Sequence, residues 1–181
     1  MKLQKANRLS SAPQLAFGCQ PHKVHSIHLE PQEYSLFSQR YCSDDYIVLS
    51  LETRLLPYLS LQENLFLNSS IKKKAKKQLL LTWLPIFHWS TTILTKEVSA
   101  LSTYERLKCQ LLQFVFSEKE TMLVTDIFSK LTVPQKQELL PLFQQITRRA
   151  QKQLILLTND RQIADNPYID VKLSLNKTEK D

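Results

Sequence analysis

The chain has 181 residues, of which 43% are hydrophobic and 23% are charged, as is usual for one globular domain. Its three cysteines, Cys19, Cys42 and Cys109, are odd in number and far apart, which excludes a disulfide framework or a cysteine zinc site. No apolar run is long enough to span a bilayer, so we expect a protein that is soluble or peripheral to a membrane. The net charge of +7 leaves nucleic acid and anionic membranes open as partners.

Short apolar runs alternate along the chain with longer segments of helical period, which predicts an α/β fold. The runs at 122–124 and 154–157 are continuously apolar, as is typical of strands covered on both faces of a parallel sheet. A helix predicted at 133–149 joins them into a βαβ unit. Strands are expected at residues 24–29, 34–38, 46–51, 121–126, 153–158 and 169–175.

Residues 60–99 show no strand pattern, which predicts an all-helical insert between strands. Helices are expected at 61–67 and 71–84, with a break at Pro85. The second of these helices carries most of the clustered positive charge, and a further cationic group ends the helix at 133–149. A solvated helix face is the simpler interpretation, and a binding patch is the alternative. The cations are Lys72, Lys73, Lys74, Lys76 and Lys77 in the first group and Arg148, Arg149 and Lys152 in the second.

The segments LLPYLSLQENL at 55–65, LSTYER at 101–106, MLVTD at 122–126 and LLTND at 156–160 stand in this order along the chain. They resemble, in the same order, motifs of the ATP-binding domains of ABC transporters. LLPYLSLQENL at 55–65 is similar to the LLPHLTVxENV stretch that follows the Q-loop, and LSTYER at 101–106 is similar to the LSGGE/Q signature. MLVTD at 122–126 resembles a Walker B strand, and LLTND at 156–160 resembles the VTHD switch. The resemblance implies an ABC-type P-loop NTPase-like fold with a mostly parallel central sheet. It also implies one degenerate nucleotide-binding domain over residues 1–175, a helical subdomain at about 57–100 and a charged tail at 176–181.

The phosphate-binding loop of the family, GxxxxGK[ST], is missing from the sequence. In the family a strand like 34–38 runs directly into this loop, whereas here QRYCSDD follows at 39–45, and Gly18 is the only glycine. We therefore expect the loop and the helix after it to be deleted, so that the fold is truncated there. The amides and the lysine of the loop hold the nucleotide phosphates, and its Ser or Thr binds Mg²⁺. The deletion would remove the anion site itself.

Other positions that the resemblance aligns with catalytic residues have also changed. Ile127 stands in place of the glutamate that polarises water, and an aliphatic side chain cannot accept a proton. Asn159 replaces the switch histidine, Leu51 the Q-loop glutamine and Val133 the D-loop aspartate. No catalytic residue and no metal site is therefore expected.

Candidate site residues remain as vestiges of nucleotide binding, namely Ser102, Glu105, Asp126 and Asn159. Each has a simpler alternative. Ser102 and Glu105 form a capping-box pattern, Asp126 is suited to cap a turn, and Asn159 with Asp160 is suited to start a short helix. The histidines His22, His25 and His28 alternate along the first strand as metal ligands would, and polar residues of an edge strand are the alternative.

The resemblance implies a pseudo-ATPase that pairs with a complete ATP-binding subunit or a permease, peripheral at the cytoplasmic face of a membrane. ATP and Mg²⁺ would be bound only if a partner subunit completes the site, and nucleic acid is not the expected partner. Candidate docking residues are Tyr58, in the best preserved motif, and Trp83, Phe87 and Trp89, which flank Pro85 in the helical insert and for which core packing is the simpler alternative. The alternative function is a basic module that binds nucleic acid or an anionic membrane without a transport role.

Overall fold

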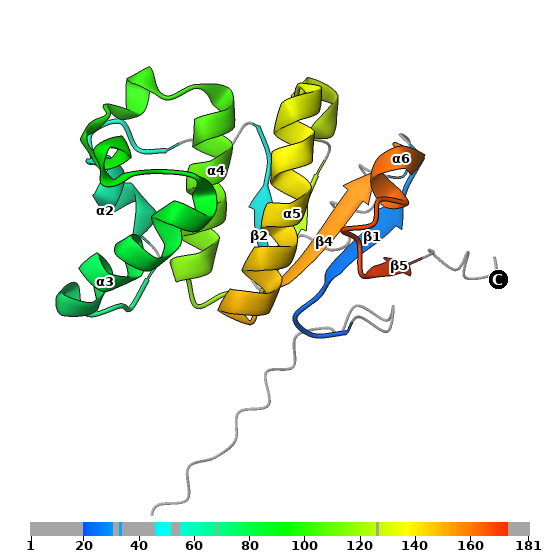
Figure 1. Ribbon diagram of the computed structural model, residues 1–181, viewed down its shortest axis with the longest axis horizontal. Coiled ribbons are helices and arrows are strands. Elements are labelled where there is room, and N and C mark those ends of the chain that lie inside the picture. Colours follow the sequence, from blue (N-terminus) through cyan, green and yellow to red (C-terminus); the bar gives the residue numbers. More distant parts are fainter. Residues whose placement is uncertain are drawn as a thin grey trace, which may run out of the picture.

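The computed structural model describes residues 20–30, 33, 46–51, 55–67, 69–125 and 127–173. Its centre is a five-stranded sheet in the order β2-β3-β4-β1-β5, and every strand pairing is parallel (Figure 1). The predicted parallel sheet and the βαβ unit are thus confirmed. The strands are β1 Val24–His28, β2 Tyr46–Leu49, β3 Thr121–Val124, β4 Gln153–Thr158 and β5 Val171–Leu173.

The strands match five of the six expected runs, and β4 has the expected bounds while the other four strands are shorter by one or two residues at one or both ends. The sixth run, at 34–38, lies outside the described residues. β1 lies in the interior of the sheet, between β4 and β5, which corrects the placement of its histidines on an edge strand. Parallel neighbouring strands must be joined by crossover connections, which are usually helical. In the described residues, helices form these connections.

The described residues form five α-helices, which carry the labels of Figure 1. α4 and α5 cover one face of the sheet, while α2, α3 and several 3₁₀ turns form a separate helical region on the far side of α4. The expected break at Pro85 is confirmed, since α3 ends at Trp83 and a 3₁₀ turn follows. The helices are α2 Leu61–Leu65, α3 Lys73–Trp83, α4 Thr103–Phe116, α5 Val133–Ala150 and α6 Arg161–Ala164. The 3₁₀ turns are Leu84–Phe87, Thr91–Thr95, Val98–Ala100 and Phe128–Lys130.

Capping boxes start α2, α4 and α5. The Ser or Thr side chain accepts from a backbone N–H three residues on, and the side chain at that position accepts from the cap N–H. α3 differs, because its N-cap is Lys72, with no side-chain cap bond and no acidic residue in the first turn. Lysines at this end of a helix oppose its dipole, which costs roughly 0.3–1 kcal/mol for each well-placed charge.

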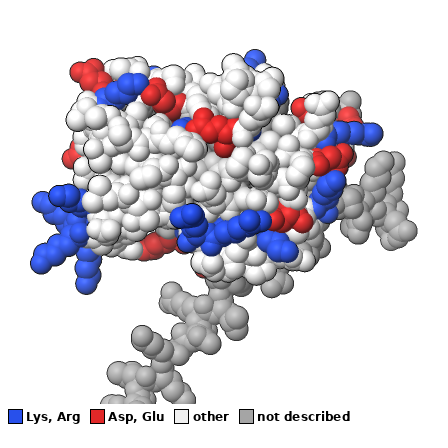
Figure 2. Space-filling view, in the orientation of Figure 1, with Lys and Arg blue, Asp and Glu red and all other residues white. Residues whose placement is uncertain are grey.

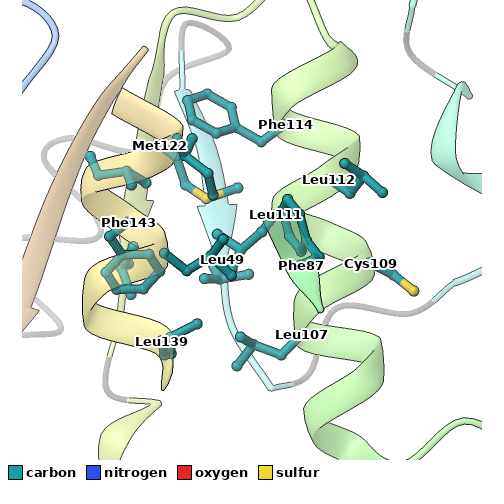
Figure 3. Packing of buried hydrophobic residues seen from close by; sticks show 14 of the residues in the cluster. Leu49, Phe87, Leu107, Cys109, Leu111, Leu112, Phe114, Met122, Leu139 and Phe143 are labelled. Atoms are coloured by element: carbon teal, nitrogen blue, oxygen red, sulfur yellow. The ribbon is translucent and has the colours of Figure 1, made fainter. Parts of the chain in front are cut away.

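The main hydrophobic core fills the space between the sheet, α4 and α5 (Figure 3). Leu49 of β2, Leu111 of α4, Met122 of β3 and Phe143 of α5 are each fully buried there. A second buried cluster of Ile27, Leu29, Leu123, Ile155 and Leu157 is separate from this core. Alternate residues of β1, β3 and β4 belong to the two clusters, so both faces of these strands are covered, as continuous apolar runs predict.

A buried lysine joins α4 to α5. Lys108 is 4% exposed, and its Nζ lies 2.7 Å from Oε1 of Glu138. The same Nζ lies 4.9 Å from the ring centroid of Trp89 and 5.5 Å from that of Tyr104. The ion pair therefore joins the two helices that cover the sheet, and the Trp89 ring brings the helical region into contact with it. In the described part of the chain, no helix has the length and apolar character needed to cross a membrane.

Candidate functional site

The carboxyl ends of the strands form the edge where a sheet of this topology binds its ligands. From β1 the chain runs to β2 at one edge of the sheet. From β4 it runs past β1 in the opposite direction, to β5 at the other edge. Ligands of open α/β sheets bind outside the carboxyl ends of the strands, where the direction of winding changes. A phosphate loop would therefore follow β1 and not the segment 34–38, from which the sequence pattern predicted it.

The chain after β1 is held by hydrogen bonds to the end of β4 and between Glu30 and Glu33. The backbone N–H of Leu29 donates to the carbonyl of Thr158 at 3.0 Å, and His28 Nδ1 lies 3.2 Å from the same oxygen. The backbone N–H of Glu30 donates to Oε2 of Glu33 at 2.9 Å, and the N–H of Glu33 donates to the carbonyl of Glu30 at 2.8 Å. Glu33 is helical, and its two hydrogen bonds with Glu30 close a turn after β1.

This turn is unsuited to an anion. A phosphate at a helix start needs free backbone N–H groups and a positive local field. Here a carboxylate already occupies the N–H of Glu30, and Pro31, the next residue, has no N–H to offer. Glu30 and Glu33 also bring two negative charges, which repel a phosphate.

The end of β3 is tied to the end of β2 by hydrogen bonds. Thr125 donates to the carbonyl of Leu49 from both its N–H, at 3.2 Å, and its Oγ1, at 3.0 Å. Asp126 lies outside the described residues, so its candidate role stays a prediction. Ile127, where the resemblance places the catalytic glutamate, is fully buried in the main core.

The end of β4 starts a short helix. Asp160 is the N-cap of α6, with Oδ1 accepting from the N–H of Gln162 at 2.9 Å, and its own N–H donates to Thr158 Oγ1 at 3.1 Å. The helix-start alternative is thus confirmed for Asp160. Asn159, the candidate switch residue, is exposed beside it.

Ser102 and Glu105 are both used by the start of α4. Ser102 Oγ accepts from the N–H of Glu105 at 3.2 Å, and Glu105 Oε2 accepts from the N–H of Ser102 at 2.8 Å. Glu105 Oε1 also pairs with Lys96 Nζ at 2.7 Å. Burial would raise the pKa of Glu105, but the hydrogen bonds from Lys96 and Ser102 outweigh it and hold that pKa below its ordinary value. The capping-box alternative is confirmed, and no hydrogen bond of the described residues joins this pair to Asn159.

Tyr104 is turned into the protein. It is half-buried, its hydroxyl donates to the carbonyl of Gln135 at 3.3 Å, and burial raises its pKa above the ordinary value. The ring therefore packs between α4 and the first turn of α5 and does not project from the helix start.

The four candidate docking residues divide into core and surface. Trp83 is 6% exposed and Phe87 is fully buried, so these two belong to the core, which corrects their expected place on a docking surface. Trp89 is half-buried, with its ring stacked 5.9 Å from that of Phe87. Tyr58 is 77% exposed and lines a surface hollow of about 510 Å³ formed by residues 57–61 and 94–99.

Asn64 organises the best preserved motif, and the sequence interpretation missed it. Its side chain is fully buried, and Oδ1 accepts from the N–H of Leu56 at 2.8 Å. Its Nδ2 lies within 2.9–3.2 Å of the carbonyls of Leu56, Leu59 and Ser60. A single amide thus ties the loop 56–60 to α2. The motif S-x-x-E at 60–63, followed directly by Asn64, is the signal that could have revealed this capped turn.

The described residues contain no group of three His, Cys, Asp or Glu side chains that could hold a metal ion. His25 is fully buried inside the sheet, and its Nε2 accepts from the N–H of Gln20 at 3.0 Å. His28 lies at the end of the strand, with Nε2 3.9 Å from Oε1 of Glu30. The alternating histidines therefore have separate environments.

Comparison of the sequence with models of protein families finds no match, and comparison with curated proteins finds no relative. The structure, however, matches solved ATP-binding cassettes. The cassette MJ0796, bound to ADP and Pi after hydrolysis, matches with a TM-score of 0.63 and 12% identity over 89% of this chain and 86% of that chain. The protein cbiO1 from Clostridium perfringens, part of the ABC transporter complex cbiONQ, matches with a TM-score of 0.69 and 13% identity over 86% and 77%.

A third match is a protein from Pyrococcus furiosus assigned as an ABC transporter ATP-binding protein. Its TM-score is 0.64, with 14% identity over 85% of this chain and 84% of that chain. The TM-scores and the coverage show that the chain has the fold of an ABC transporter ATP-binding cassette. At these low identities the likeness shows the fold alone. The expected fold class is confirmed.

Proposed function

We propose that the chain is a cassette-type subunit of a membrane transporter that does not hydrolyse ATP by itself. It pairs with a complete ATP-binding subunit or with a permease, and it is peripheral at the cytoplasmic face of the membrane. The fold supports the general class, because the structural neighbours are ABC transporter cassettes and one of them is part of a transporter complex. ATP and Mg²⁺ are bound only where a partner subunit completes the site.

The observation that carries the loss of ATP hydrolysis is the turn after β1. In this topology the anion site lies at the carboxyl end of β1, and there the carboxylate of Glu33 takes the N–H of Glu30. The sequence supplies no GxxxxGK[ST] anywhere in the chain. The buried Ile127 gives no base at the position after Asp126.

Thermal unfolding with increasing MgATP tests this proposal. A native-state ligand at 100 times its Kd stabilises by about 2.7 kcal/mol. For a domain of this size that corresponds to a rise in Tm of roughly 5–11 °C. We expect no saturable rise up to millimolar MgATP, relative to MgCl₂ with NaCl at matched ionic strength. A saturable rise with ATP, absent in the salt control, would show that the chain binds nucleotide and would contradict the proposal.

Partner docking is assigned to the hollow that Tyr58 lines, since Tyr58 is the exposed aromatic among the four candidates. Purification of the tagged chain from membranes, with identification of the proteins that accompany it, tests the pairing. Tyr58→Ala should weaken the association by about 2 kcal/mol or more if Tyr58 is a hot spot. Asp126→Asn should leave it unchanged. The opposite pattern would mean that the carboxyl edge of the sheet is the working surface.

A further inference from the structure

The exposed face of α3 carries a concentration of unpaired positive charge. Lys73, Lys74 and Lys77 are exposed, as is Lys72 directly before the helix. Lys76 is half-buried, with its Nζ 4.9 Å from the ring centroid of Phe66. None of the ion pairs found among the described residues uses a lysine of α3. Figure 2 shows Lys and Arg side chains projecting from the end of the molecule where α3 lies.

The position of Lys72, Lys73 and Lys74 at the start of α3 lowers the stability of the fold, and no ion pair of the described residues compensates for it. The first turn of a helix has unbonded N–H groups and a positive field, and α3 starts there with lysines, no acidic residue and no side-chain cap. Each of the other described α-helices has a side-chain cap, from Ser or Thr at α2, α4 and α5 and from Asp160 at α6. A negatively charged partner outside the molecule would explain why these lysines are gathered at a place where they lower the stability of the fold.

Apolar side chains accompany the lysines. Leu81 is 48% exposed and lies seven residues after Lys74 and four after Lys77, which places the three on one side of the helix. Leu67, which is 49% exposed, lies in the segment that leads from α2 to α3. We call Lys72, Lys73, Lys74, Lys77 and Leu81 the lysine face.

We propose that the lysine face binds the surface of a membrane that contains anionic phospholipids. A cluster of four or more lysines on a helix matches the diffuse charge of such a surface, and an exposed leucine beside them can enter the acyl boundary. The proposal concerns the chain alone and does not depend on the proposed function.

Nucleic acid fits this face less well. Sequence-independent contacts to single strands use aromatic rings for stacking, and the aromatic residue of α3, Trp83, is buried. Guanidinium groups, which bind phosphates with two parallel hydrogen bonds, are absent from the helix.

The second cationic group is not an equivalent surface. Arg148 pairs with Asp170 at 3.5 Å. Lys152 is 9% exposed and its Nζ donates to the carbonyls of Ser117, at 2.9 Å, and Lys119. Burial lowers the pKa of Lys152, as expected for a cation inside the protein.

Sedimentation with vesicles tests the proposal, using phosphatidylcholine alone and phosphatidylcholine mixed with phosphatidylserine. We expect binding to the mixed vesicles only, weakening as NaCl is raised. The variant K73Q/K74Q/K77Q should bind about 100-fold more weakly, from about fivefold for each lysine near the surface. Leu81→Ser should weaken binding without changing its salt dependence.

The matched control is K130Q/R149Q/R161Q, which removes three positive charges from exposed positions elsewhere. It should bind the mixed vesicles nearly as well as the parent chain. An equal loss of vesicle binding in both triple variants would mean that the net charge of the chain, and not the lysine face, causes binding. Equal binding to both vesicle types would mean that anionic lipid is not needed. Tighter binding to a DNA or RNA oligonucleotide, lost in the α3 variant, would assign the face to nucleic acid. Each of these results would overturn the proposal.

Discussion

Replacement of Asn64 by alanine should destabilise the chain strongly, because this buried amide holds the loop 56–60 against α2. The change removes the acceptor for the N–H of Leu56 and the donors to three carbonyls. Each buried backbone group left without a partner costs about 1–3 kcal/mol. The carbonyls of Leu56 and Ser60 keep backbone N–H donors, from Leu59 and residue 64, so we expect a total loss of about 2–4 kcal/mol.

Urea unfolding followed by circular dichroism measures this loss as a lower transition midpoint with an unchanged m-value. Gln62→Ala, on the same helix but exposed, is the control and should change stability by less than about 0.5 kcal/mol. Equal stability of N64A and the parent chain would refute the reasoning. The motif LLPYLSLQENL would then have no demonstrated structural role, and its retention would point back to docking.

The remaining predictions concern three buried groups. Glu138→Gln should cost about 1–3 kcal/mol in urea unfolding, since it leaves Lys108 a buried cation without its carboxylate, whereas the paired change Lys108→Met with Glu138→Gln should restore part of the loss. Burial lowers the pKa of His25 below 6.5, so the unfolded chain binds more protons, and unfolding free energy should fall as the pH drops from about 6.5 through the lowered pKa. His25→Leu should remove that part of the pH dependence and the exposed His22→Gln should not, as chemical denaturation at each pH will show. Burial raises the pKa of the Cys109 thiol to about 12, so in a variant without other cysteines it should react with iodoacetamide at pH 8 only after unfolding.

The fold was predictable from the sequence where local signals and burial agree. The apolar runs at 122–124 and 154–157 form interior strands, and the capped, periodic segment after Thr132 forms α5. The order of strands was not predictable from periodicity, because it depends on pairings between residues far apart in the chain. As a result, the phosphate-loop position was expected after residues 34–38, although the topology places it after β1.

The candidate site was predicted less well, because aromatic residues beside a proline look the same in sequence whether they pack inward or outward. Trp83 and Phe87 are buried by the 3₁₀ turn after α3, and Tyr58 is the one candidate docking residue that is largely exposed. Asn64 was missed for a related reason. Its importance comes from four contacts that converge on one buried amide, and no single-residue pattern predicts such convergence.

The interior place of β1 has a consequence for how the chain acquires its structure during synthesis. β1 is made before the other strands of the described residues, yet its neighbours are β4 and β5, and His28 contacts Thr158 across a separation of 130 residues. Until β4 has been synthesised, β1 has no neighbouring strand, and its apolar side chains Val24 and Ile27 stay exposed and can form non-native contacts. We expect fragments that stop before Gln153 to aggregate or to require a chaperone, while full-length chains fold in a late step that closes the sheet around β1.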